Sequence, residues 1–359
     1  MRAAFLPGLN EKIDVRDDVQ VIGPGPGEVR VRIVATGVCH SDISAQNGTL
    51  PQPIPCILGH EGAGEIIELG EGVTNLGVGD HVIVAWVPPC GECKFCLRGQ
   101  PNLCQVLFLA GATAQRFLVG AQPVFGFAGT GTFAEELVIP HQAAIKIDDD
   151  VPLDVASLIG CGVMTGVGAA LKTAHVEPGS SVVVFGCGGV GISVIQGARI
   201  AGAAEIIAVD LLPEKLELAK QFGASHATTP DGLAEVSASI TGGDGFDYGF
   251  EVIGRPETIR SAYDATRRGG TTVVVGAGAM DAMLTFSAFE LFYMEKKILG
   301  CWYGSADVRT DFHMMLRLWR TGRLKLEEMI TKRLDISDIN EAFDACARGQ
   351  AIRQVIEFK

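Results

Sequence analysis

Short apolar runs separated by glycine and proline characterise the first part of the chain. Four runs have the length and composition of β-strands, and they cover residues 28–34, 64–69, 80–86 and 136–139. The Gly and Pro clusters between them are typical of turns. The pattern over residues 25–150 therefore predicts a β-rich domain.

From residue 181 the pattern changes to strands and helices in alternation. The predicted strands cover residues 182–185, 206–210, 248–252 and 271–275, and the predicted helices cover residues 190–200, 213–222 and 256–267. This alternation predicts an α/β domain with a parallel sheet and helices on both faces. Helical stretches at 312–319 and 339–347 lie in a tail that we expect to return to the first domain.

Two stretches without a charged residue, 155–171 and 180–198, are long enough to be compared with membrane spans. Both are rich in glycine, and the second divides into an apolar strand, a tight turn and the start of a helix. We therefore expect that neither stretch crosses a membrane.

The composition is that of a protein with ample hydrophobic core. A chain of 359 residues is too long for one ordinary domain, so two are expected. Hydrophobic residues make up 47% and charged residues 20%, and the net charge of -13 argues against a nucleic-acid or anionic-membrane partner. No secretory signal is visible after Met1, so we expect reduced thiols and a cytoplasmic protein.

Four of the ten cysteines lie close together, with the spacing of a tetrahedral metal site. They follow the pattern Cys-x-x-Cys-x-x-Cys with a fourth cysteine after seven further residues, and they are Cys90, Cys93, Cys96 and Cys104. The residues between them are mostly polar or turn-forming. Four thiolates leave no open coordination position, which is typical of a structural zinc.

Three further candidate ligands, Cys39, His60 and Cys161, are scattered along the chain. Two thiolates and one imidazole would leave the fourth position of a second zinc free for water or substrate, as a Lewis-acid catalyst requires. The alternative is that the cysteines are small buried apolar residues and the histidine an ordinary loop residue. Four cysteines remain outside both sets and are expected to be buried apolar residues: Cys56, Cys187, Cys301 and Cys346.

A glycine motif follows an apolar strand in the second domain and opens a helix. Its G-x-G-x-x-G glycines are Gly186, Gly188 and Gly191, which permit a tight turn and leave a helix N-terminus facing a pyrophosphate. Asp210 ends the next strand, where a carboxylate can bind the adenosine ribose and repel a 2′-phosphate, which favours NAD over NADP. The alternative is a turn that packs a helix on a sheet, with Asp210 as a helix cap.

In combination, these segments resemble the zinc-dependent medium-chain alcohol dehydrogenases along nearly the whole chain. The matching segments are residues 37–42, 59–64, 129–133, 160–162 and 352–353, together with the four-cysteine lobe and the glycine motif. The most similar branch is the longer-loop one, with the glutathione-dependent formaldehyde dehydrogenases and the aryl or terpenyl alcohol dehydrogenases.

The resemblance implies a GroES-like β-rich catalytic domain and a Rossmann domain. The catalytic, zinc-binding domain would comprise residues 1–161 and 304–359, and the NAD-binding domain residues 162–303. It also implies a homodimer that acts on a small alcohol or aldehyde. A zinc ion would polarise the alcohol oxygen so that hydride passes to the nicotinamide.

The resemblance also suggests roles for residues near the catalytic ligands. Ser41 could accept the alcohol proton, but Ser44 stands where similar enzymes often carry a histidine that continues the proton relay. Asp42 would orient His60, and Glu61 would tune the metal or ligate it transiently. Taken singly, both carboxylates could also be surface charges.

Further residues are expected to bind the cofactor or the substrate. His40 and Arg353 are candidates for the cofactor pyrophosphate and Lys215 for the adenosine ribose, although each could be a solvated charge. The resemblance places Trp86, Phe127 and Ala128 in the substrate pocket.

Aromatic walls favour an apolar, aromatic or allylic primary alcohol. A glutathione adduct of formaldehyde ranks second because residues 48–57 contain no carboxylate; Arg116 could offer it a charge. Two alternatives from other classes are a catalytically silent dinucleotide-binding protein and a zinc-free reductase, and about two zinc ions per chain would argue against both.

Overall fold

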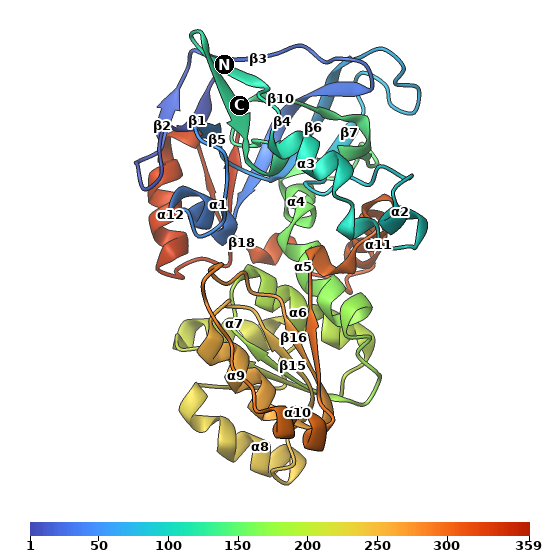
Figure 1. The fold of residues 1–359 in the computed structure, drawn as a ribbon, viewed down its shortest axis with the longest axis vertical. Helices are drawn as coiled ribbons and strands as arrows, with labels where there is room; N and C mark the ends of the chain where they lie inside the picture. The colour runs from blue at the N-terminus through green and yellow to red at the C-terminus, as the bar shows by residue number, and fades with distance from the viewer. The chain divides into compact units, whose positions relative to one another are not determined.

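The computed structural model describes residues 1–359, which form two compact units. Unit 1 comprises residues 1–162, 307–321 and 326–359, and unit 2 comprises residues 163–306 and 322–325. Both ends of the chain therefore belong to unit 1, where α12 (Ile339–Ala347) packs beside α1 (His40–Gln46), red and blue in Figure 1.

Unit 1 contains two β-sheets. The first has the order β2-β1-β5-β9-β8-β3, with strands β1 (Ala3–Leu6), β2 (Asp14–Arg16), β3 (Val19–Val21), β5 (Cys56–Ile57), β8 (Phe117–Val119) and β9 (Gln122–Gly126). The second has the order β11-β7-β6-β4-β19-β18, with β10 also paired to β4. Its strands are β4 (Glu28–Val38), β6 (Glu61–Leu69), β7 (His81–Val84), β10 (Glu136–Pro140), β11 (Ala144–Lys146), β18 (Ile330–Leu334) and β19 (Arg353–Glu357).

One core of unit 1 joins these sheets, because alternate residues of β4, Val29, Val31 and Ile33, are buried against residues of β1, β8 and β9. The remaining helices of this unit are mostly short: α2 (Lys94–Leu97), α3 (Val106–Ala112), α4 (Leu153–Ser157) and α11 (Val308–Arg320). Helix α5 (Gly162–Gly168) begins at the last residue of the first segment of unit 1.

Unit 2 contains one parallel sheet of order β14-β13-β12-β15-β16-β17. Its strands are β12 (Ser181–Phe185), β13 (Glu205–Val209), β14 (His226–Thr228), β15 (Phe246–Glu251), β16 (Thr266–Val274) and β17 (Lys297–Gly300). Its helices after α5 are α6 (Gly189–Ala201), α7 (Pro213–Phe222), α8 (Leu233–Thr241), α9 (Pro256–Ala265) and α10 (Ala288–Met294). The strand order reverses between β12 and β15, which is the doubly wound arrangement with its crevice at the carboxyl ends of these strands.

Local sequence explains the boundaries of the helices in unit 2. Helix α7 begins with Pro213 in its first turn and ends before Gly223 at φ 121°, and α6 ends before Gly202 at φ 90°. Proline suits the first turn and glycine the left-handed residue after the last one. The predicted bounds of α7 and α12 are the observed ones, whereas β4, β6 and β16 are longer than predicted because tertiary pairing extends them.

No single helix is long and apolar enough to cross a membrane. Only the bent pair of helical stretches Leu153–Gly160 and Gly162–Thr173 reaches that length and hydropathy when the two are taken together.

Candidate active site

Strand pairing brings Cys39 and His60 together. Strand β4 ends at Val38 and β6 begins at Glu61, and the antiparallel register pairs Gly37 with Glu61. The residue after the first strand and the residue before the second are therefore neighbours. Gly59, at φ 92°, turns the chain into His60, and a Cβ there would lie 2.5 Å from the Phe133 nitrogen.

Cys161 completes the cluster from a 3₁₀ turn, Leu158–Gly160, which packs against β6 and β7. A Cβ on Gly160 would lie 3.1 Å from the Val84 oxygen, so glycine lets this turn approach the sheet closely. One candidate ligand atom from each of Cys39, His60, Glu61 and Cys161 lies within 4.8 Å of the others, and all four residues are buried. The structure thus brings together the three predicted ligands of the catalytic zinc and the adjacent carboxylate.

The Asp42 carboxylate organises both sides of this cluster. Its Oδ2 accepts a hydrogen bond from the Cys39 N–H at 3.1 Å, and its Oδ1 accepts one from the Gly59 N–H at 3.0 Å. The same Oδ1 lies 3.1 Å from Nδ1 of His60. Because this contact occupies Nδ1, the other ring nitrogen of His60 is left for the cluster.

Glu61 and Arg353 form a buried ion pair next to these ligands. Nη1 of Arg353 lies 3.3 Å from Oε1 of Glu61, which also accepts a hydrogen bond from the Gly162 N–H at 3.2 Å. The pairing of β19 with β4, in which Gln354 lies opposite Val38, brings Arg353 to this place. Sequence reasoning missed this pair, since the two residues lie at opposite ends of the chain and no local pattern links them.

The buried charges shift the pKa values in the cluster. The pKa of Cys39 lies well below its ordinary value because the Cys161 thiol hydrogen-bonds to it, and His60 and Arg353 act in the same direction. Burial raises the pKa of Glu61 to about 7, although Arg353 opposes this shift. Burial disfavours the charged form of His60, but Asp42 outweighs it and raises the pKa of the imidazole.

The proposed proton-relay residues lie on α1 beside Cys39. Oγ of Ser41 lies 3.6 Å from the Cys39 sulfur, and Ser41 is half-buried. Ser44 is buried on the same helix, and His40 is exposed in its first turn. The roles of these residues stay predictions.

Aromatic rings flank His60. The ring of Phe127 lies 5.2 Å from that of His60 and the ring of Trp86 lies 6.3 Å from it, both edge-on. Ala128 follows Phe127 at φ 51° in a short 3₁₀ turn. Arg116, by contrast, forms an ion pair with Glu28, so its charge is already neutralised.

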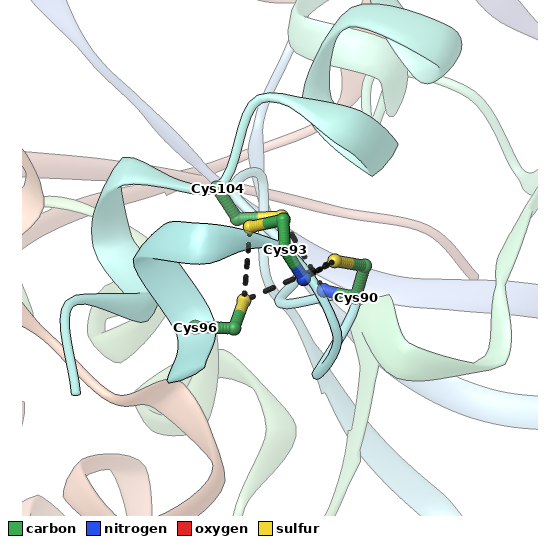
Figure 2. A group of neighbouring side chains, drawn as sticks. All are labelled: Cys90, Cys93, Cys96 and Cys104. Carbon is green, nitrogen blue, oxygen red and sulfur yellow. Dashed lines mark hydrogen bonds between the residues drawn. The ribbon is translucent and has the colours of Figure 1, made fainter. Parts of the chain in front are cut away.

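The other four predicted ligands form a second cluster, in which one sulfur from each of the four cysteines lies within 4.8 Å of the rest (Figure 2). Backbone N–H groups of Cys90 and Cys93 donate to the sulfurs of Cys104 and Cys90, each at 3.3 Å. The pKa of Cys93 is lowered to about 7, first by the Cys96 N–H. Such a set of sulfurs has the donor chemistry of a closed zinc site.

Unit 2 holds the glycine motif at the carboxyl end of β12. Gly186 has φ 96°, and a Cβ on Gly191 would lie 1.8 Å from the Gly186 oxygen, so both positions require glycine. A Cβ on Gly188 would meet nothing within 4 Å. This middle glycine therefore leaves open space at the N-terminus of α6, where a phosphate can approach the backbone.

Asp210 follows the last residue of β13 and turns toward this motif. Its Oδ2 accepts a hydrogen bond from the Cys187 N–H at 2.8 Å, and its Oδ1 accepts one from the Leu212 N–H at 3.1 Å. Lys215 is half-buried in the first turn of α7. The predicted cofactor residues are thus divided, because His40 and Arg353 belong to unit 1 and the others to unit 2.

Two family models match the chain, the first within unit 1 and the second mostly within unit 2. The model of the alcohol dehydrogenase GroES-like domain matches residues 25–149, and the model of the zinc-binding dehydrogenase matches residues 189–320. A relative named alcohol dehydrogenase class-3, from Drosophila melanogaster, is 41% identical over 96% of this chain and 94% of its own length. The chain belongs to the zinc-dependent medium-chain alcohol dehydrogenase family.

Other members of this alcohol dehydrogenase family are also similar along their whole lengths. The S-(hydroxymethyl)glutathione dehydrogenase of Paracoccus denitrificans is 37% identical, with 99% of both chains covered. The crystal structure of benzyl alcohol dehydrogenase from Acinetobacter calcoaceticus matches with a TM-score of 0.92 and 31% identity, covering 100% of this chain and 99% of the other. These findings confirm the predicted α/β fold, with a GroES-like domain and a Rossmann domain, and the assignment as an oxidoreductase.

The residues of this alcohol dehydrogenase fit a zinc ion and a dinucleotide. Nε2 of His60 is buried without a hydrogen-bond partner in the structure, as expected for a nitrogen that binds a metal. The open space at Gly188 fits a dinucleotide phosphate.

Of the four cysteines outside the clusters, Cys56 and Cys187 are buried as expected, whereas Cys301 and Cys346 are only half-buried. The expectation of full burial was wrong for these two; Cys346 packs at the margin of a core cluster of unit 1.

Proposed function

We propose that this alcohol dehydrogenase interconverts apolar primary alcohols, aromatic or allylic in the preferred cases, and their aldehydes with NAD. The observation that carries this proposal is the pair of aromatic rings, Trp86 and Phe127, that stand edge-on to the candidate ligand His60. Such walls stabilise an apolar carbon skeleton and offer no charge to a polar one. The likeness to a benzyl alcohol dehydrogenase supports the same substrate class.

Cys39, His60 and Cys161 would hold the catalytic zinc, which would supply Lewis-acid polarisation of the alcohol oxygen. Asp42 fixes the orientation of the imidazole through Nδ1. Ser41 Oγ, beside Cys39, accepts the alcohol proton. The proton would pass on through the cofactor ribose, and Ser44 stands where similar enzymes often carry the histidine that receives it. Cys90, Cys93, Cys96 and Cys104 would hold the structural zinc.

The choice of NAD rests on Asp210. A carboxylate at the end of the second strand hydrogen-bonds the adenosine ribose and repels a 2′-phosphate. We accordingly propose that residues 1–161 and 304–359 form the catalytic domain and that residues 162–303 form the NAD-binding domain.

A panel of alcohols tests the proposed function. NADH formation is followed with ethanol, benzyl alcohol, an allylic terpenoid alcohol, and formaldehyde with and without glutathione. We expect the highest kcat/KM for the benzylic or allylic alcohols. Equal or lower values for these than for ethanol would contradict the proposed preference.

The second candidate substrate is S-(hydroxymethyl)glutathione. Two relatives named for class-3 and glutathione-linked activity favour it. Against it, residues 48–57 carry no carboxylate and Arg116 is already paired with Glu28. Turnover of formaldehyde only when glutathione is present would establish this candidate in place of the first.

We also propose a homodimer, formed in the cytoplasm. Strand β17 ends the sheet of unit 2, and exposed apolar residues of α10, such as Phe289 and Phe292, precede it. An edge strand flanked by exposed apolar side chains is a surface that pairing with a second copy would cover. Light scattering on the eluted protein is expected to give twice the 37.8 kDa of one chain, and a monomer would contradict the proposal.

A further inference from the structure

A small pocket lies beside the Trp86 indole, and it is not part of the metal-ligand cluster. Its volume is about 10 Å³, roughly the space for one water molecule. Trp86 borders both places, since it faces His60 and also lines the pocket. Several other lining residues have the smallest side chains: Ala85, Gly111, Ala128, Gly129 and Ala143. No zinc ligand is among the lining residues.

Helix α3 forms one wall of this pocket, to which it contributes Leu107 and Gly111. Phe108 contacts the Trp86 indole at 6.1 Å between ring centres, and Leu107 lines the pocket. A Cβ on Gly111 would lie 3.2 Å from the Gly129 Cα, so the helix rests backbone against backbone on the turn that contains Ala128. Among the residues that line the pocket beside the indole, Leu107 has the largest aliphatic side chain.

Helix α3 is held in place by few buried groups. Leu107, Phe108, Gly111 and Ala112 are half-buried, but none of its seven residues is fully buried. No side chain caps its N-terminus, and Leu109 on its outer side is 54% exposed. A short helix without a fully buried residue or a side-chain cap is expected to shift at a lower cost in free energy than a packed strand. The wall formed by Trp86 and α3 therefore differs from the packed strands β4 and β6, which position Cys39 and His60.

We propose that the pocket beside Trp86 gives the indole room to move, and that this yielding wall sets the size of the largest alcohol this enzyme accepts. A bulky substrate pushes the indole toward the pocket, and Leu107 limits how far the indole moves. This inference rests on the proposed alcohol dehydrogenase activity. It assigns Leu107 as a specificity-determining residue that acts through Trp86 and does not touch the reacting atoms.

Leu107→Ala tests the inference, with Leu109→Ala as the matched control on the outer side of the same helix. We compare kcat/KM for 2-naphthylmethanol with kcat/KM for ethanol. Since one or two methylene groups of pocket space are worth about tenfold in specificity, Leu107→Ala is expected to raise this ratio about tenfold and Leu109→Ala to leave it unchanged. Ala143→Val, which fills the pocket, is expected to lower the ratio while ethanol oxidation persists.

A binding measurement separates a change in pocket size from a change in chemistry. Unreactive formamides with N-substituents of increasing size are titrated calorimetrically into the NADH complex of each variant. Tighter binding of only the large formamides to Leu107→Ala supports the yielding wall. If the wild type oxidises ethanol and naphthylmethanol but Leu107→Ala and Leu109→Ala give the same ratio, the inference is overturned. If the wild type oxidises no alcohol, the proposed function itself fails.

Discussion

At the scale of single residues, the Asp42 carboxylate contacts the two chain segments that carry the candidate metal ligands Cys39 and His60. It contacts the backbone of Cys39 and Gly59 and the ring of His60. Each contact is an ordinary hydrogen bond, but together they fix where a sulfur and a nitrogen stand. We therefore expect the zinc affinity of the site to depend on a residue that is not itself a candidate ligand.

Asp42→Asn is expected to lower the zinc affinity of this cluster about 10- to 100-fold, because the amide holds the imidazole less firmly and without charge. Zinc retained against increasing concentrations of a chelator measures the effect. Asp344→Asn, at an exposed position of α12, serves as the control. Equal retention of both zinc ions in Asp42→Asn would show that the carboxylate does not support the site.

The cofactor preference also depends on one residue. Asp210→Ser removes the charge that repels a 2′-phosphate, so the ratio of kcat/KM for NADP to that for NAD is expected to rise by about tenfold or more, or roughly 1.4 kcal/mol. Initial rates with both cofactors give this ratio. Asp231→Ser, an exposed position of the same unit, controls for the loss of one negative charge. An unchanged ratio in Asp210→Ser would contradict the assigned role.

At the scale of secondary structure, β4 is the element on which the metal cluster depends. It pairs with β6 and β19, and through these two pairings Cys39, His60 and Arg353 become neighbours. In unit 2 a comparable link joins the start of β12 to β15. The Asp247 carboxylate accepts from the Ser181 N–H and hydroxyl, each at 2.8 Å, and pairs with Arg267 at 2.7 Å.

Asp247→Ala is expected to lower the free energy of unfolding by about 1–3 kcal/mol, because the Ser181 N–H loses its acceptor. Burial disfavours the charge of Asp247, but Ser181 and Arg267 outweigh it and hold the pKa below 3.8. For a carboxyl with a depressed pKa, this stabilisation is present above the unfolded pKa and is lost as the pH falls through the folded one.

Thermal unfolding at a series of pH values measures this linkage. The difference in melting temperature between wild type and Asp247→Ala should be constant near neutrality and shrink below pH 3.8. Asp244→Ala, an exposed residue of the preceding turn, is the control and should match the wild type. A difference that grows on acidification would refute the link.

At the scale of the whole molecule, the metal clusters and the glycine motif lie in separate compact units. Both metal clusters belong to unit 1, whereas the glycine motif and Asp210 belong to unit 2. Damage to one site should therefore leave the local structure of the other intact. This separation makes binding and turnover independently measurable.

Cys39→Ala is expected to reduce kcat by about a thousandfold or more, because losing Lewis-acid assistance costs several kcal/mol. The zinc content should fall from about two ions per chain to about one. NAD affinity, measured by calorimetry, is expected to change less than about twofold. Cys346→Ala, which changes a half-buried cysteine of the same unit, provides the control. Undiminished turnover in Cys39→Ala would contradict the assignment of the catalytic ligands.

Much of the fold and of the candidate ligands could be predicted from local sequence. Cysteine spacing predicts the lobe of Cys90 to Cys104 because nearby residues close a metal cage without help from the rest of the chain. The glycine motif could be predicted because Gly186 and Gly191 each satisfy a constraint within one turn and its helix. The extent of β4 and β16 could not, because pairing with distant strands determines where they end.

The sequence by itself therefore determined local features. These are the four-cysteine lobe, the strand–turn–helix of the dinucleotide motif and the alternation of strands and helices that predicts the parallel sheet. Only the tertiary structure decided that Arg353 pairs with Glu61, that Arg116 pairs with Glu28, and that a pocket lies beside Trp86. The physical reason is that buried ion pairs and pocket volumes depend on side chains from strands far apart in the chain. No local pattern of residues encodes those contacts.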